Sequence, residues 1–427
     1  MHPRHDRRRQ RERLLLEMTG LPTAAGREDR VIAFIERWVA DRPRLALSRD
    51  PAGNLWIVAA RVADRRPQRH DEPGVVVFEA HLDHPAFVVT ECVSVRRAWA
   101  EFRGGVKPPY FDGARVRLCR DGRPDVRGRV AQTVEPDETA GRVFRRARLE
   151  FEEDAEAQPG EIATWDLPAP VIERGRLRAP ACDDLAAVAA ALSALEELLP
   201  DDGQDTLPTG QSDEVRVARS AADTDVRVLL TRAEEVGFVG AIAACRSGSI
   251  PAPARIIALE NSRAFADSPI GAGPIVRVGD RLSVFSPGLT AAVAKVAQGL
   301  AKRGDDPAGA GPHNAGRAAS GFRWQRKLMP GGACEASAFC AFGYEATCVC
   351  LPLGNYHNMG RLDEVERALA SGQDAREAPI VPEEIGVEDF HGLVDLLVAC
   401  GRGIGAAEPL AARLERMYAE RSHVLDG

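Results

Sequence analysis

Side chains that bind metals in proteins follow short apolar runs at several places in this 427-residue sequence. The runs VVVF, VRVLL, RIIAL and ATCVCLPL have the length and composition of buried strands. Each run is followed closely by imidazole or carboxylate groups, and two aspartates precede the apolar helix pattern LAAVAAALSALEELL. The residues concerned are His81, Asp83, His84, Asp183, Asp184, Glu234, Glu235, Glu260 and His357.

In an open sheet of parallel strands, ligands bind beyond the carboxyl ends of the strands, so we expect these side chains at one edge. Several carboxylates at one point repel each other unless a cation lies among them. A mixed set of nitrogen and oxygen ligands suits Zn, Co or Mn. Two histidines and three carboxylates can hold two ions if one carboxylate bridges them. Of two adjacent glutamates, one can then bind metal while the other moves protons.

Each residue has a simpler interpretation when it is taken alone. Asp183 could cap the helix that follows it. His81 could be a hydrogen-bonded structural histidine, and the pair Glu234 and Glu235 could be a solvated turn. Only their joint occurrence after predicted strands favours a metal site.

Helix and strand patterns alternate through the C-terminal half of the chain. This predicts an α/β fold, with a mainly parallel mixed sheet and helices on both faces. Residues 87–173 show strand patterns separated by turn signals, which predicts a small inserted all-β domain. The catalytic domain is therefore expected to be split into 1–86 and 174–427. Residues 201–214 and 303–316 are expected to form surface loops.

The amino-acid composition limits which partners the protein can have and in which cellular compartment it is expected. The net charge of -7 argues against nucleic acid or an anionic membrane as the main partner. Nine cysteines without a CxxC pair are typical of core thiols in a reducing compartment. No apolar run is long enough to span a membrane, and the basic N-terminal segment has too short an apolar run for a signal peptide. We therefore expect a cytoplasmic protein.

The motifs around these residues resemble the glutamyl-aminopeptidase and deblocking-aminopeptidase family of dinuclear metallo-aminopeptidases, within the clan of co-catalytic zinc peptidases. The resemblance runs through most of the chain and rests on LPTAAGREDRV, DPAGNLW, AHLDHPAF, PACDDLAA, TRAEEVGFVGA, GAGPIV, GGACEASA and LGNYHN, in that order. It implies a zinc-peptidase-like fold with a β-rich insert and removal of N-terminal residues from peptides. It also implies two divalent ions per chain, with Zn first and Co or Mn as alternatives, and a homo-oligomer built on dimers.

The resemblance also implies a set of metal ligands. In the family pattern one metal is held by His81, Asp183 and Glu260. The other is held by Asp183, Glu235 and His357, so that Asp183 bridges the two ions. A hydroxide held between the ions would attack the substrate carbonyl.

Two further roles follow from the resemblance. Glu234 is the expected general base, which takes a proton from the attacking water and later gives it to the leaving amine. Asp83 is the expected carboxylate that orients His81. By the alternation of a strand, positions 81 and 83 share a face and His84 points away from the site. The family pattern does not call for a histidine at position 84.

The chain departs from the family pattern in segments near the expected site. It has Ala333-Cys334-Glu335 where the family usually has Thr-Asp after Gly-Gly, and Asn355-Tyr356 directly before the last histidine where Arg-Tyr is usual. Glu335 and Tyr356 are therefore candidate substrate-binding residues. These departures leave two alternatives open: a metal-dependent deacylase or amidase acting on N-acyl amino acids, and a non-catalytic scaffold of the same fold.

Overall fold

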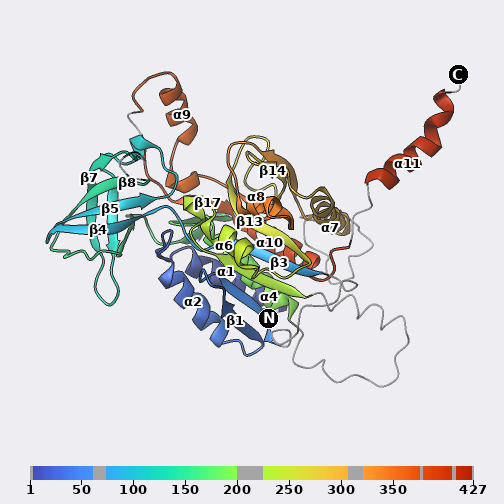
Figure 1. Ribbon diagram of the computed structural model, residues 1–427, viewed down its shortest axis with the longest axis horizontal. Coiled ribbons are helices and arrows are strands. Elements are labelled where there is room, and N and C mark those ends of the chain that lie inside the picture. The colour runs from blue at the N-terminus through green and yellow to red at the C-terminus, as the bar shows by residue number, and fades with distance from the viewer. Residues whose placement is uncertain are drawn as a thin grey trace.

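The computed structural model describes residues 3–60, 74–137, 139, 141, 143–199, 225–305, 321–375, 378–405 and 410–425. The loop expected at 201–214 lies outside the described residues, as do residues 306–316 of the second expected loop. Figure 1 shows a main body of sheet and helices, a group of strands at one side of it, and a C-terminal helix that projects from the other side.

An eight-stranded sheet runs through the main body in the order β1-β2-β12-β3-β13-β16-β14-β15. Its strands are β1 (Leu45–Arg49), β2 (Leu55–Ala59), β3 (Val75–His81), β12 (Val226–Thr231), β13 (Ala254–Arg263), β14 (Ile275–Asp280), β15 (Gln325–Met329) and β16 (Glu345–Leu353). The central strand β3 is parallel to both neighbours, β12 and β13, and β13 is parallel to β16. β1 and β2 are antiparallel, and so are β14 and β16. The predicted α/β class with a mixed sheet is confirmed.

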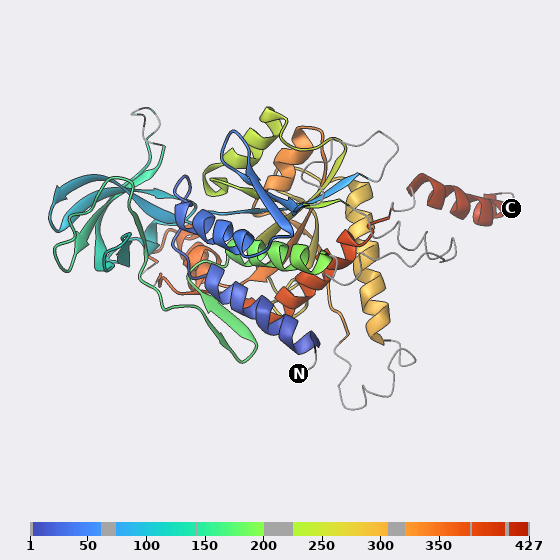
Figure 2. The ribbon, with the colours of Figure 1, turned by 90° about the horizontal axis from the view of Figure 1, so that it is seen from below.

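Helices cover both faces of this sheet because its central strands are apolar on both sides. Val76 and Phe78 of β3 pack into the cluster that contains α4 and α10, whereas Val77 packs with α6 and α8. Figure 2 shows these layers on opposite sides of the sheet. The helices of the main body are α1 (Pro3–Met18), α2 (Asp29–Ala40), α4 (Leu185–Leu198), α6 (Val239–Ser247), α7 (Pro287–Asp305), α8 (Glu335–Ala341) and α10 (Val387–Gly401). A further helix, α9 (Leu362–Ala370), lies apart from them on the side of the barrel in Figure 1.

Six strands at one side of the molecule form a closed barrel in the order β4-β5-β8-β7-β6-β9 (Figure 1). They are β4 (Ala86–Ser94), β5 (Arg97–Arg103), β6 (Arg115–Cys119), β7 (Val126–Val134), β8 (Arg145–Phe151) and β9 (Ile162–Trp165). Alternate residues of these strands point inward, as in β5, where Ala98, Ala100 and Phe102 are buried. Phe102 packs edge-on against Phe87 inside the barrel, with ring centroids 4.8 Å apart.

A small antiparallel sheet of β10 (Val171–Glu173), β11 (Arg176–Ala179) and β17 (Glu383–Gly386) joins the chain leaving the barrel to a segment near the C-terminus. Short 3-10 helices occur as η1 (Pro108–Tyr110), η3 (Glu234–Val236), η5 (Tyr356–Asn358) and η6 (Ser422–Leu425). Both η3 and η5 follow closely on strands of the central sheet, so the sheet determines where these turns begin.

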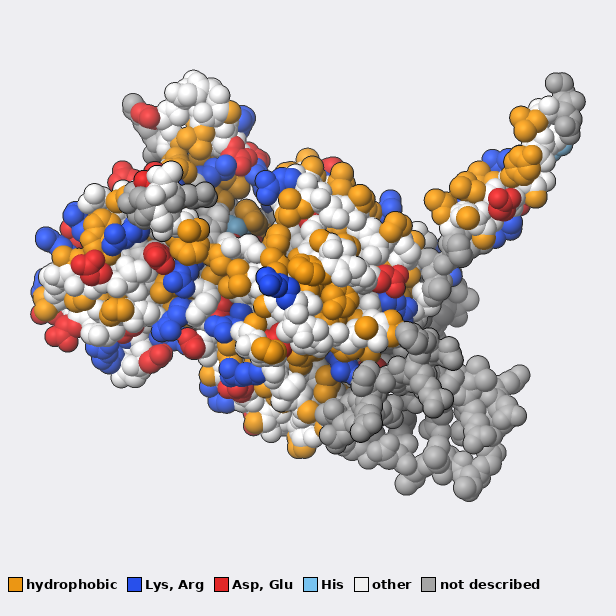
Figure 3. All heavy atoms as spheres, in the orientation of Figure 1, with side chains coloured by type: hydrophobic (Ala, Val, Ile, Leu, Met, Phe, Trp, Pro, Cys, Tyr) orange, Lys and Arg blue, Asp and Glu red, His pale blue; other side chains and the backbone are white. Residues whose placement is uncertain are grey.

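The last helix, α11 (Leu410–Arg421), projects away from the main body in Figure 1. Leu410, Leu414 and Tyr418 lie at helical spacing and are exposed, and Figure 3 shows apolar side chains along this helix. Among the described residues, no helix combines the length and the apolar character needed to cross a membrane.

Candidate metal centre

Strands β3, β12, β13 and β16 bring the predicted site residues to one edge of the sheet. His81 is the last residue of β3 and pairs with Thr231, the last residue of β12. Because β3 and β12 are parallel, the turn that follows Thr231 and carries Glu234 lies beside His81. Glu260 lies within β13, and the turn η5 after β16 carries the remaining histidine of the predicted set.

Asp183 lies between the two histidines, and each of its carboxylate oxygens faces a different one. Oδ1 is 3.4 Å from Nε2 of His81, and Oδ2 is 3.4 Å from Nε2 of His357. Glu260 Oε1 lies 3.9 Å from the same nitrogen of His81. Glu235 Oε1 lies 3.2 Å from the same nitrogen of His357. The geometry is therefore that of two clusters sharing one carboxylate.

The donor atoms of these clusters fit divalent cations. Ligand atoms of His81, Asp183, Asp184 and Glu260 lie within 4.8 Å of one another, and so do those of Asp183, Glu235 and His357. Within the described residues, Asp183 Oδ1 and Glu235 Oε1 are buried and have no hydrogen-bond partner. Buried oxygens are costly without a partner, and two imidazole nitrogens with several carboxylate oxygens are a donor set that suits Zn, Co or Mn.

Both histidines present Nε2 to the centre because the other ring nitrogen is already bonded. Nδ1 of His357 donates to the backbone carbonyl of Gly105 at 2.7 Å, from the loop that follows β5 of the barrel. Nδ1 of His81 donates to the backbone carbonyl of Asp83 at 3.2 Å. A carbonyl oxygen can only accept a hydrogen bond, so these contacts assign the proton to Nδ1 and leave Nε2 as a lone-pair donor.

The carboxylate of Asp83 contacts His81 and also holds the glutamate turn. Oδ1 is 3.7 Å from Nδ1 of His81. The same oxygen accepts the backbone N–H of Glu234 at 3.0 Å, and Oδ2 accepts that of Glu235 at 3.0 Å. Asp83 is completely buried, so its charge is compensated mainly by these contacts.

The expectation that His84 points away from the site is wrong. β3 ends at His81, so the alternation of a strand does not extend to position 84. Nδ1 of His84 contacts the backbone carbonyl of Asp183 at 2.5 Å, and Nε2 contacts Oδ1 of Asn358 at 3.1 Å. His84 therefore lies against the backbone that carries Asp183 and against the neighbour of His357.

Crowding of carboxylates shifts the pKa values of the site. Burial raises the pKa of Glu260 to about 7, and the charge of Asp183 adds to that effect. Burial also raises the pKa of Glu234 well above its ordinary value, and Glu235 adds to the rise while His81 opposes it. For His81, burial lowers the pKa, but Glu234 and other carboxylates outweigh that effect and raise it. Perturbed pKa values of this kind are common where charged groups are arranged for catalysis.

The two candidate substrate-binding residues lie in different surroundings. Glu335 is only 3% exposed, and Thr231 donates its hydroxyl to Oε2 of Glu335 at 2.6 Å. The same hydroxyl lies 3.0 Å from a carboxylate oxygen of the buried Glu79. The ring of Tyr356 stacks on that of His357, with centroids 3.7 Å apart. A role for Glu335 or Tyr356 in substrate binding stays a prediction.

Sequence reasoning missed several residues that hold the centre together. Glu383 on β17 accepts hydrogen bonds from the backbone N–H groups of Asp183 and His357. Asn261 donates its side-chain amide to Asp184 Oδ1 at 2.7 Å. Asn261 could have been noticed because it directly follows Glu260. Glu383 carries no signal of this kind, since it lies in a short strand 26 residues after His357 and 200 residues after Asp183.

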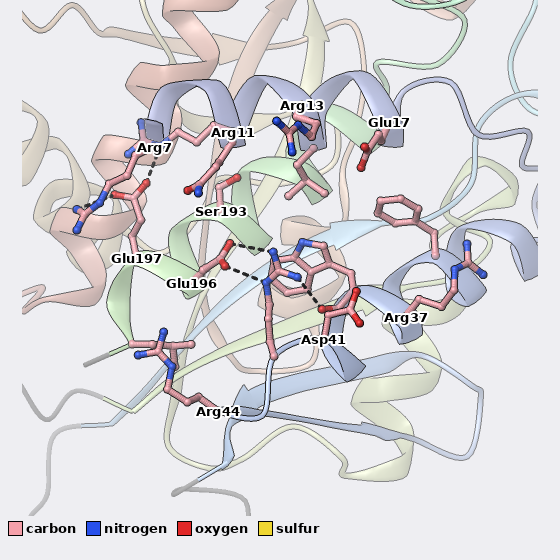
Figure 4. Close-up of a pocket in the computed structure, with 16 residues that line it drawn as sticks. Arg7, Arg11, Arg13, Glu17, Arg37, Asp41, Arg44, Ser193, Glu196 and Glu197 are labelled. Carbon is pink, nitrogen blue, oxygen red and sulfur yellow. Dashed lines mark hydrogen bonds and ion pairs between the residues drawn. The ribbon is translucent and has the colours of Figure 1, made fainter. Parts of the chain in front are cut away.

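A separate hollow of about 720 Å³ lies between α1, α2 and α4 (Figure 4). Its walls include six arginines, but Arg11 pairs with Glu197 at 2.7 Å and Arg42 with Glu196 at 2.9 Å. The candidate metal ligands are not among the residues that line it. We assign it no role in the chemistry.

Comparison with protein families decides the class of this chain. Residues 62–301, more than half of the sequence, match the family described as M42 glutamyl aminopeptidase. The chain belongs to this family. The protein is therefore a metal-dependent hydrolase of the aminopeptidase type. The matched range contains every predicted ligand except His357, which lies beyond its end.

Solved structures support the same fold for this M42 protein. The aminopeptidase APDkam598 from the archaeon Desulfurococcus kamchatkensis is 18% identical, with a TM-score of 0.62 over 93% of this chain and 96% of that one. The TET1 peptidase of Pyrococcus horikoshii is 17% identical, with a TM-score of 0.61 over 92% and 99%. Yeast aminopeptidase 1 is 13% identical, with a TM-score of 0.54 over 93% and 98%. No curated protein matches the chain.

Proposed function

We propose that this M42 protein removes N-terminal residues from peptides with two divalent ions, Zn first and Co or Mn as alternatives. The observation that carries the proposal is the position of Asp183, whose two carboxylate oxygens each lie 3.4 Å from a different histidine. In the proposed assignment one ion is bound by His81, Asp183 and Glu260, and the other by Asp183, Glu235 and His357. Asp183 bridges them.

Two divalent ions bound by these residues would polarise the scissile carbonyl and the attacking water. The chain itself supplies the proton transfer. Glu234 takes a proton from the attacking water and delivers it to the amine that leaves. Its Oε2 lies 3.9 Å from Nε2 of His81, and its backbone is held by Asp83, so the carboxylate lies beside the cluster without being bonded into it. Asp83 thus positions both His81 and Glu234.

The remaining parts of the proposal concern organisation. We take residues 1–86 and 174–427 as a split catalytic domain, and 87–173 as an inserted β-rich domain. The closed barrel, whose strands run from Ala86 to Trp165 and which has its own aromatic core, supports this division. We also propose a cytoplasmic homo-oligomer built on dimers. The TET1 peptidase of Pyrococcus horikoshii, described as assembling into a tetrahedron or a large octahedral shell, supports self-assembly by analogy.

The test uses purified full-length protein, its metal content and a panel of peptides. We expect up to two ions per chain, loss of activity with a chelator, and recovery when Zn, Co or Mn is returned. Each peptide is offered with a free and with an acetylated N-terminus. Cleavage that requires the free amine supports the aminopeptidase. Preferred cleavage of the acylated substrates would contradict the aminopeptidase proposal and favour the alternative hypothesis, a deacylase or amidase that uses the same centre.

A further inference from the structure

Glu383 binds two of the three chain segments that supply the second metal cluster, the ones that carry Asp183 and His357. Its side chain lies on β17 and is completely buried. Oε2 accepts the backbone N–H of Cys182 at 2.7 Å and that of Asp183 at 3.0 Å. Oε1 accepts the backbone N–H of His357 at 2.8 Å. One carboxylate therefore ties the segment before α4 to the turn after β16.

The turn that carries His357 depends on support from its surroundings. Asn355, His357 and Asn358 have φ angles of 54°, 53° and 64°, in the left-handed region that L-residues adopt at an energetic cost. Such a backbone persists only where neighbouring groups hold it. Glu383 bonds the N–H of His357, and the carbonyl of Gly105 bonds its ring. Between them, these two contacts determine the position and the direction of the imidazole.

Burying a carboxylate at this position has a high cost in free energy. It lies near the negative charge of Asp183, and burial of a charged group is unfavourable unless hydrogen bonds compensate it. Three backbone N–H groups provide that compensation for Glu383. An amide offers a single acceptor oxygen, so a glutamine could bond one segment but would turn its NH₂ group toward the N–H donors of the other. A carboxylate has two acceptor oxygens, so Glu383 can bond the segment of Asp183 with one and the turn of His357 with the other.

We propose that Glu383 is a positioning residue of the metal centre, which holds Asp183 and His357 at the separation that the second ion requires. The inference rests on the proposed function, because it assumes that these residues bind metal. The first cluster depends less on Glu383. His81 and Glu260 lie on β3 and β13, whose backbones are fixed by the central sheet. Loss of Glu383 should therefore weaken the two ion-binding steps unequally.

The experiment titrates metal-free protein with Co²⁺ and follows the visible absorption spectrum and the two binding constants. The variants are Glu383→Gln and Glu383→Asp, with Glu384→Gln as the matched control. Glu384 is the next residue of the same strand, but it bonds Arg178 at 3.0 Å and stands half-buried at the surface. We expect the weaker Co²⁺ step of Glu383→Gln to lose roughly 10–100-fold in affinity, with a changed spectrum. The control should stay within about twofold of the parent, well below the loss typical of groups that orient ligands.

Activity provides a second readout that separates positioning from general damage. Excess Co²⁺ should restore much of kcat in Glu383→Gln, because mass action refills the weakened site. Glu383→Asp keeps two charged oxygens but is one methylene shorter, so we expect an intermediate loss of affinity. Normal affinity and a normal spectrum in Glu383→Gln would overturn the inference. If the parent itself bound no ion, the proposed function would fail, and the two failures are thus distinguishable.

Amide hydrogen exchange keeps the inference testable if neither variant folds. In the metal-free parent, the N–H groups of Asp183 and His357 should exchange slowly, because both are bonded to a buried carboxylate. Fast exchange at His357, at a rate like that of the exposed turns, would show that Glu383 does not hold it and would overturn the inference.

Discussion

The carboxylate of Asp83 accepts the backbone N–H of Glu234 at 3.0 Å, so the predicted general base is held by the chain that leaves β3. Asp83 also accepts the N–H of Glu235 and lies 3.7 Å from the ring of His81. One buried aspartate thus relates a predicted metal ligand on β3 to the turn after β12.

Glu234→Gln should keep the metal and lose the reaction. Glutamine has nearly the same shape, but it cannot take a proton from water at neutral pH. We expect kcat to fall by about 10²–10⁴-fold, with metal content unchanged within error. Steady-state kinetics and metal analysis check this, with Glu36→Gln as a control on an exposed ion pair with Arg49. A variant that hydrolysed peptides at the parent rate would remove Glu234 from the mechanism.

Asp83→Asn should damage both stability and the metal centre. The amide keeps one acceptor oxygen and leaves one backbone N–H of the glutamate turn facing an NH₂ group. We expect a loss of roughly 1–3 kcal/mol in the free energy of unfolding and roughly a 10–100-fold loss in metal affinity. Urea unfolding of the metal-free protein and metal titration measure the two effects separately.

Asp389→Asn is the matched control for that variant. Asp389 is also buried, and it accepts the backbone N–H groups of Gly271 and Gly273 at 2.6 and 2.8 Å. The Asp389→Asn variant should therefore lose a similar free energy of unfolding, with no change in metal affinity. Equal losses of affinity in the two variants would mean that Asp83 acts only through general stability.

Gly104→Ala should disturb the contact between the barrel and the metal centre. Gly104 has a φ of 135°, and an added Cβ would lie 2.6 Å from Cβ of Pro85. Its neighbour Gly105 bonds the ring of His357. We expect a loss of roughly 2–3 kcal/mol in stability, from backbone strain and overpacking, together with lower activity.

Gly113→Ala is the comparison for that substitution. Gly113 also has a positive φ, of 65°, but an added Cβ would meet open space. Thermal unfolding of Gly113→Ala should show a loss of only about 1 kcal/mol in the free energy of unfolding, since the cost of a positive φ for alanine is the only penalty that remains. Activity should be unchanged. Equal effects at the two glycines would contradict the role of close packing at Gly104.

His391 on α10 should make stability depend on pH below neutrality. Burial lowers its pKa below 6.5, Arg8 and Arg11 lower it further, and Glu12, which lies 2.9 Å from Nε2, raises it. The unfolded chain then binds a proton that the folded chain does not. The stability that this group contributes is therefore complete above about pH 6.5 and is lost as pH falls through the lower, folded-state pKa.

The variant His391→Gln checks this sign. The difference in unfolding free energy between pH 7.5 and pH 5.5 should be smaller in the variant than in the parent. The exposed His423 is the control, and His423→Gln should leave the parent slope unchanged. An unchanged slope in His391→Gln would contradict the assignment.

Much of the centre could be predicted because it lies where strands end. Apolar runs identify strands locally, and strands that run parallel have their carboxyl ends at the same edge of the sheet. The register of β3 with β12 pairs His81 with Thr231, which brings Glu234 close without any further information.

The prediction for His84 failed where the local pattern stopped. Alternation applies only inside a strand, and β3 ends three residues earlier. Beyond that point the direction of each side chain depends on the path of the loop and on its partners. His84 lies against the carbonyl of Asp183, which is distant in the sequence.

The sequence by itself determined the fold class, the family and which side chains could meet at the sheet edge, because hydrophobic periodicity and the succession of helices and strands along the chain are visible in the local sequence. Only the tertiary structure decided how those side chains are held. Glu383 bonds Asp183 and His357, and Asp83 bonds the turn of Glu234, through contacts between segments far apart in the chain. Such contacts depend on how loops pack in three dimensions, and no periodic pattern in the sequence encodes them.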